Sequence, residues 1–374
     1  MFNLGQETRN KYVPEGILPS AYDPTTIFVR GPNDNPSILS GYTYAMGMYP
    51  ETLEGVDLME SFDDLTNIPV TETEVNQIRG DLVMNRPECG YQRLDFYPGN
   101  DDREYLSKPR KMYHGQKEKI DHQLNLAKDE FENKNGNDLY VELARAMGKN
   151  ERDIDFSSAI LYLDDYITTK ANRKAIPFDL DYRTQNLIDE YYSYYFGKGY
   201  FRDEGLNKLF TNSYFTNLAK ELLMKYSAIT ENKYHERFIQ NLRHNVHIGN
   251  HLTFAAIMHQ LGEMKYYTPS FGQKLEWILF ERNGEFYVKA ELEGRHINLE
   301  GNADYEGNIK LFDLLEYLCS KMYYGSVIDA IAGLEDPSEY TNKKFNCIDH
   351  LNNYESLHDN ELRKSLTEIE NEIK

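Results

Sequence analysis

The stretch that decides the fold is residues 275–292, which read LEWILFERNGEFYVKAEL. Two apolar runs rich in aromatic and aliphatic residues, Leu275–Glu281 and Phe286–Leu292, flank the pair Asn283 and Gly284. Asn-Gly between two such runs is the strongest short-range signal for a β-hairpin, because both residues tolerate the positive φ of a tight turn. The sequence therefore predicts an antiparallel hairpin here.

The segment before this hairpin, residues 247–261, reads HIGNHLTFAAIMHQL. It predicts the end of a strand at about 242–249, followed by a helix with apolar residues at helical spacing. Near the N-terminus, the run Thr26–Val29 predicts another strand, which Gly31 and Pro32 end. A helix is expected from about Ser37, with one apolar face made by Ile38, Leu39, Tyr42 and Met46.

The rest of the chain predicts a discontinuous domain. Residues 1–75 and 226–330 are expected to form an α/β core, and residues 76–225 a helical insertion, since apolar residues recur at helical spacing from about 115 to 225. A core helix is predicted at about 309–322. Residues 331–374 form a polar C-terminal extension, with an exposed charged helix expected at 355–374.

Composition limits the function classes. The formal charge of the 374 residues is -20, which repels polyanions and argues against nucleic acid as a partner. No apolar run is long enough to predict a transmembrane segment. The three cysteines match neither a zinc site nor a disulfide framework. We therefore expect a soluble intracellular protein of a reducing compartment, not a secreted one.

Residues 245–292 resemble the histidine acid phosphatases, in particular the lysosomal and prostatic branch. That family has a strand ending in His-Asp, a helix, a proline-containing turn, and a hairpin of the type Leu-x-x-Leu-x-Phe-Glu-x-x-Gly-x-Tyr-x-Val. Here Asn250 and His251 end the strand, Pro269 lies in the turn, and the hairpin matches closely. Val29-Arg30 resembles the family's Val-Arg-Ser-Thr-x-x-x-Arg, with Pro36 at the second arginine position.

The resemblance implies a mixed central sheet flanked by helices, with an inserted helical subdomain. It also implies a phosphate pocket of which Arg30, Asn250 and His251 are the vestiges. A register shifted by one would place His251 on the family's histidine, but Leu252 would then replace the acid. Either way the His-Asp pair is broken.

The family's nucleophile is the histidine of an Arg-His-Gly-x-Arg-x-Pro motif on its first core strand, and no copy of that motif occurs in this sequence. The resemblance therefore implies no catalytic residue, no cofactor and no metal. His244 and His247 are close in sequence and could suggest a metal site. On a strand, however, they would point to opposite faces and could not bind the same ion. A gap in or near the centre of the sheet, filled by another segment or chain, is expected where the first strand belongs.

The leading hypothesis is a catalytically inactive structural or accessory subunit of a large multiprotein assembly, since the 30 tyrosines suit interfaces with other protein subunits. A mitochondrial membrane complex and an axonemal or other cytoskeletal assembly are the candidates considered. Two alternatives stay open. One is a phosphatase completed by a second chain that supplies the nucleophile, and the other is a phosphate-binding module.

Overall fold

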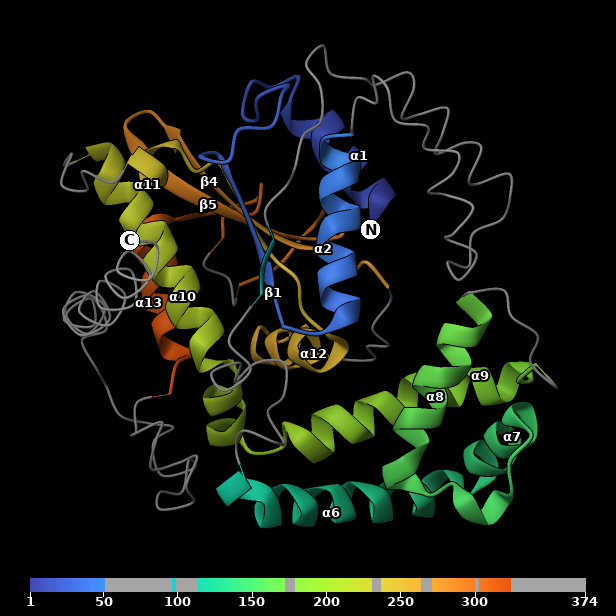
Figure 1. Ribbon diagram of the computed structural model, residues 1–374. Helices are drawn as coiled ribbons and strands as arrows, with labels where there is room; N and C mark the ends of the chain where they lie inside the picture. Colours follow the sequence, from blue (N-terminus) through green and yellow to red (C-terminus); the bar gives the residue numbers. More distant parts are fainter. Residues whose placement is uncertain are drawn as a thin grey trace, which may run out of the picture.

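The computed structural model describes residues 1–50, 96–98, 114–171, 179–230, 237–263, 271–299 and 303–323 (Figure 1). The fold is mixed α/β, as the sequence predicts. Its strands form two sheets, and the helices α6 to α9 gather at one end of the molecule, away from the hairpin strands β4 and β5. No helix within these ranges is long and apolar enough to cross a membrane.

The first sheet is parallel and has the order β2-β1-β3. Its strands are β1 (Ile27–Gly31), β2 (Phe96–Pro98) and β3 (His244–His247). The expectation that the segments near 26–30 and 242–249 share a sheet is confirmed, because β1 and β3 pair in register from Ile27 opposite His244 to Arg30 opposite His247. Residues more than 200 positions apart therefore meet at the C-terminal ends of neighbouring strands.

The second sheet is the predicted hairpin with two short additions. Strands β4 (Leu275–Arg282) and β5 (Glu285–Leu292) are antiparallel, and β5 also pairs with β6 (Arg295–His296) and β7 (Asn308–Lys310). Asn283 and Gly284 both have positive φ, at 55° and 80°, as the Asn-Gly signal requires. Helix α13 (Leu311–Ser320) packs on this sheet with the buried residues Leu311, Leu314, Leu315 and Leu318.

Within the described residues no ladder joins β3 to β4, so the strands are divided into two sheets. Among the described strands the layer is therefore divided between β3 and β4, and the predicted gap stays a prediction. Helices α1 (Phe2–Tyr12) and α2 (Asn35–Met48) contact one face of this layer, and α10 (Glu204–Thr230) contacts the other.

The predicted apolar face of α2 is wrong. Leu39 and Tyr42 are 64% and 41% exposed, and the helix buries a different side that includes Gly41, Tyr44 and Gly47. The reason is the close approach of α1. A Cβ built on Gly47 would lie 2.1 Å from the carbonyl oxygen of Phe2. Backbone contact across small residues, which apolar periodicity does not reveal, sets the orientation of α2.

The helical insertion has its own core. It comprises α6 (Lys117–Asn135), α7 (Asp138–Met147), α8 (Phe156–Ala171), α9 (Tyr182–Tyr192) and a π-helix at Ser193–Tyr200. Its core is rich in aromatic rings, and Tyr191 donates a 2.6 Å hydrogen bond to the carbonyl of Phe156. The N-terminal half of α10 packs into this core and its C-terminal half into that of the second sheet.

The structure agrees with some of the predicted domain boundaries and not with others. Strand β2 lies inside the segment 76–225 that was assigned to the insertion, yet it pairs with β1 of the first sheet. The shorter helices α11 (Arg237–Asn241) and α12 (His251–Gln260) flank β3, as expected for the core. The polar extension at 331–374, the charged helix at 355–374 and Pro269 lie outside the described residues.

Candidate functional site

The predicted site residues lie at, or shortly after, the carboxyl ends of the neighbouring strands β1 and β3. Arg30 is the last residue but one of β1 and stands opposite His247 on β3. The expectation that Asn250 and His251 end the strand is wrong, because β3 ends at His247; Asn250 is the N-cap of α12 and His251 is its first residue. Arg30 and the start of α12 both lie on the side of the carboxyl ends of parallel strands, where ligands of open α/β sheets commonly bind.

Arg30 engages a histidine that sequence reasoning did not assign to the site. Its Nε donates a hydrogen bond to Nδ1 of His247 at 3.0 Å. The other ring nitrogen of His247 lies 3.4 Å from Oε1 of Glu221 on α10. Because Nδ1 must be unprotonated to accept, the ring carries its proton on Nε2, facing Glu221. Both nitrogens of His247 are therefore occupied.

Asn250 is the N-cap of α12. Its side-chain oxygen accepts hydrogen bonds from the backbone N–H of Thr253 at 3.0 Å and from the Thr253 hydroxyl at 3.1 Å. An asparagine at this position satisfies one of the N–H groups that a helix leaves unpaired at its start. The residue thus has a structural task that the family resemblance did not suggest.

His251 pairs with a carboxylate of the helical insertion. Its Nδ1 lies 3.6 Å from Oδ2 of Asp164 on α8, and its side chain is 37% exposed. Burial raises the pKa of Asp164, and the charge of His251 acts in the opposite direction. The ring also lies against Phe196 of the π-helix, with centroids 6.1 Å apart. His251 therefore links the core to the insertion.

His244 faces away from this site. Tyr44 of α2 contacts its Nε2 at 2.8 Å, whereas His247 reaches α10 on the opposite face of the sheet. Burial lowers the pKa of His244 to about 4, so the ring is neutral at pH 7. Among the residues that the structure describes, no group of three or more His, Cys, Asp or Glu side chains could hold a metal ion.

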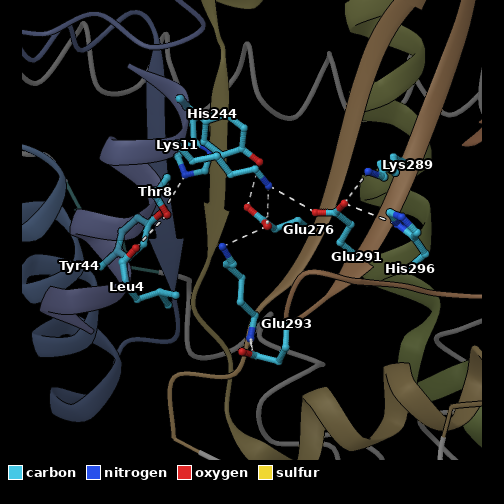
Figure 2. Close-up of polar contacts among 12 residues, drawn as sticks. Leu4, Thr8, Lys11, Tyr44, His244, Glu276, Lys289, Glu291, Glu293 and His296 are labelled. Carbon is cyan, nitrogen blue, oxygen red and sulfur yellow. Dashed lines mark hydrogen bonds and ion pairs between the residues drawn. The ribbon is translucent and has the colours of Figure 1, made fainter. Parts of the chain in front are cut away.

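A second polar cluster, which no sequence pattern had indicated as a site, joins α1 to the hairpin strands (Figure 2). Lys11 lies 3.5 Å from Glu276 on β4 and 3.4 Å from Glu291 on β5, which stand opposite each other in the ladder. Lys289 and His296 also approach Glu291, at 2.8 Å and 3.6 Å. We call these residues, together with Tyr12, Lys274 and His244, the Glu276 cluster.

Opposite charges keep Lys11 and Glu291 of the Glu276 cluster in their charged forms. Burial alone would lower the pKa of Lys11, but the Tyr12 hydroxyl and the charges of Glu276 and Glu291 raise it above its ordinary value. Burial alone would raise the pKa of Glu291, yet Lys289 and Lys11 keep it below its usual range. The only sequence signal for this cluster was that each of the two apolar hairpin strands contains a glutamate, Glu276 in one and Glu291 in the other.

Two surface pockets lie elsewhere in the molecule. One is lined mainly by α6 residues with Ser157 and Tyr195, and the other by residues between Phe201 and Lys321, including His259. Neither has Arg30, Asn250 or His251 among its lining residues. The predicted phosphate site is thus a cluster of paired side chains at a strand end.

No family model and no curated protein matches the sequence. Solved structures do match the fold. The phytase from Citrobacter braakii gives a TM-score of 0.52 at 10% identity, covering 86% of both chains. The apo form of Hafnia alvei phytase gives a TM-score of 0.49 at 11% identity, covering 86% of this chain and 85% of that one.

The likeness to the Citrobacter braakii phytase, a histidine acid phytase, extends far beyond the two segments on which the sequence resemblance rested. At 10% identity it bears on the path of the backbone and not on the chemistry of any side chain. This chain has a histidine acid phosphatase-like fold.

Proposed function

We propose that this protein is a non-catalytic member of the histidine acid phosphatase fold that serves as a structural subunit of a multiprotein assembly. The observation that carries the proposal is the state of the predicted phosphate site. Arg30, Asn250 and His251 are all engaged within the chain, and a carboxylate lies beside each histidine of the site.

Those two carboxylates disfavour a phosphate ester. Glu221 is 3.4 Å from His247 and Asp164 is 3.6 Å from His251, so an incoming dianion would meet a like charge beside either histidine. Like charges at such distances cost free energy that increases as the site loses water. Phosphoryl transfer instead depends on preorganised positive groups around the transferring oxygens.

The contacts of the two histidines limit which ring nitrogen could act as a nucleophile. Both nitrogens of His247 are occupied, by Arg30 and by Glu221. A histidine nucleophile needs a neutral, unoccupied nitrogen about 3 Å from phosphorus, in line with the leaving oxygen. Asp164 lies on the Nδ1 side of His251, so Nε2 is the nitrogen of this ring that could attack, and the nearby carboxylate would repel a dianionic substrate.

The first experiment measures hydrolysis of p-nitrophenyl phosphate by the purified chain and by its native complex. We expect no turnover above that of an Arg30→Met, His251→Ala double variant prepared in the same way, which is the matched control for contaminating enzyme. Turnover by the complex that the double variant abolishes would instead support a phosphatase completed by a second chain.

The second experiment tests assembly. The chain, tagged and isolated from its source cells without denaturation, is expected to elute far above its 43.8 kDa mass with partner chains in fixed stoichiometry. Fractionation of the cells would then distinguish a mitochondrial membrane complex from an axonemal one. Elution as a free monomer without partners would contradict the proposal.

A phosphate-binding module is the remaining alternative, and thermal unfolding with inorganic phosphate tests it. A ligand that binds only the native state raises the melting temperature in proportion to RT ln(1 + [L]/Kd). We expect no shift at millimolar phosphate beyond that produced by an equal ionic strength of chloride. A shift that Arg30→Met removes would favour the binding module.

A further inference from the structure

Two strand edges lie close together without pairing. Among the described residues β3 pairs only with β1, and β4 pairs only with β5. Tyr12 of α1 connects the two edges, because its hydroxyl donates to Glu276 of β4 at 3.1 Å and its ring lies 6.4 Å from that of His244 on β3. Figure 2 shows His244, Lys11 and Glu276 together at this place.

Helices cover both faces of the region between these edges. On one face, α1 reaches across with Tyr12 and Lys11. On the other face, α10 contacts β3 through Glu221 and His247, and it contacts β4 through Tyr214, which accepts a 2.9 Å hydrogen bond from Trp277. Helices α1 and α10 therefore lie on the two faces of the region between these edges.

The free edge of β3 can be assigned to particular backbone groups. The N–H groups of His244 and Ile248 donate to the carbonyls of Thr26 and Arg30, at 3.0 Å and 2.7 Å. Every second residue of a parallel strand bonds to the same neighbour. The backbone N–H and C=O of Asn245 and His247 therefore point to the opposite edge, toward β4.

The side chain of Asn245 gives independent evidence that a binding partner is missing from the described contacts of β3. Its side-chain Oδ1 is buried and has no hydrogen-bond partner among the described residues. Leaving a buried acceptor without a partner costs about 1–3 kcal/mol, so native proteins rarely do so without a ligand, water or partner at the site. A donor that comes from outside the described contacts would satisfy this oxygen.

We infer that an extended segment of a second polypeptide chain inserts between β3 and β4 and joins the two sheets. Its backbone pairs with Asn245 and His247, and one of its side-chain donors satisfies Asn245 Oδ1. Each described strand of this chain already belongs to its own ladder, so none of them is available for this role.

The surroundings define the segment's chemistry. β3 has four residues, so the pairing stretch is of similar length. The charged groups of the Glu276 cluster already pair with one another, and the segment therefore needs no charge on the side that faces α1. Addition of a strand to a sheet edge is a general mode of peptide recognition, with affinity from main-chain hydrogen bonds. The inference rests on the proposed role as a subunit.

Amide hydrogen exchange at single-residue resolution tests it, on the chain alone and on the native assembly. The amides of Asn245 and His247 are expected to exchange on the order of 100-fold more slowly in the assembly. The amides of His244 and Val246 are internal controls on the same strand. They face β1, so their protection should change little.

Each other outcome overturns the inference in a distinct way. Equal protection of Asn245 and His247 in the lone chain would mean that this chain fills the space itself. Fast exchange in an intact assembly would leave the edges unpaired, and the subunit role would stand without strand insertion. A chain that has no partners at all would overturn the proposed function as well.

A variant gives a second readout. Asn245→Leu removes the orphan acceptor, so we expect the lone chain to be as stable or more stable, while the partner binds several-fold to about tenfold more weakly because one hydrogen bond is lost. Tyr305→Ala, at a residue 93% exposed, is the control and should change neither quantity. A less stable lone chain with unchanged assembly would overturn the inference.

Discussion

Single glycines set the contact of α1 with α2. A Cβ on Gly5 would lie 2.1 Å from the Tyr44 carbonyl, and one on Gly47 would lie 2.1 Å from the Phe2 carbonyl. We predict that Gly47→Ala lowers the free energy of unfolding by about 1–3 kcal/mol, since two backbones must separate. Denaturant titration measures this.

Gly197→Ala is the matched control for that experiment. Gly197 is helical and a Cβ added there would have no atom within 4 Å, so alanine should be neutral or slightly stabilising. Equal midpoints for Gly47→Ala and wild type would mean that α1 and α2 do not approach as closely as described.

His244 makes stability depend on pH. Burial depresses its pKa to about 4 from an unfolded value of about 6.5, so the unfolded chain binds more protons between these values. The contribution is therefore complete above about pH 6.5 and is lost as pH falls toward 4, by at most roughly 3 kcal/mol at 1.36 kcal/mol per unit. Chemical denaturation at a series of pH values measures it.

His244→Gln should flatten that part of the profile, because an amide can still meet the Tyr44 hydroxyl but does not titrate. His259, whose pKa burial also lowers, remains in the variant and leaves a smaller slope of the same sign. An unchanged profile would assign the acid sensitivity to other groups.

Restoring the family's pair tests whether the loss of chemistry is confined to two side chains. Asn250→His with His251→Asp should give no phosphatase activity, since the family's nucleophile belongs to the Arg-His-Gly motif, which this sequence lacks. The structure predicts a cost as well. The N-cap bond to Thr253 is lost, at about 0.5–2 kcal/mol, and the new aspartate faces Asp164. Turnover of p-nitrophenyl phosphate would contradict our account of the site.

At the scale of elements, the hairpin depends on its turn. Gly284 has φ of 80° and no atom within 4 Å of a built Cβ, so alanine there meets only a backbone penalty. We predict that Gly284→Ala costs about 1–2 kcal/mol. Asn283→Gly is the control and should cost less, because glycine tolerates the φ of 55°. Equal costs would argue against the tight turn.

The elements also show where periodicity succeeds and fails. It predicted α13 and the hairpin correctly, since each buries one apolar side against a single core. It gave the wrong face for α2, where Leu39 is exposed and Gly47 is buried. The difference is physical, because a contact made by backbone atoms has no apolar side chain to signal it.

For the whole molecule, the cysteines offer a direct test of compartment. The spacing of the three cysteines matches no disulfide framework and favours a reducing compartment, whereas Cys319 of α13 is disulfide-bonded. We therefore predict one free thiol per denatured, unreduced chain, measured with Ellman's reagent. Reduction first should raise the count to the three that the sequence holds. Three thiols without reduction would restore the expectation of a reducing compartment.

The sequence by itself determined the order of the main elements, because hairpin, strand and helix signals are local. It also led to the fold class, through hairpin and strand residues that resemble a known family. Arg30, Asn250 and His251 could be placed near strand ends on that basis.

Only the tertiary structure decided what those residues do. Glu221 and Asp164 lie on distant helices, and no local pattern shows that they meet His247 and His251. The edges of β3 and β4, which no described strand pairs, and the orphan oxygen of Asn245 likewise arise from packing. Contacts between segments far apart in the chain depend on how whole elements dock, and a one-dimensional pattern does not encode that docking.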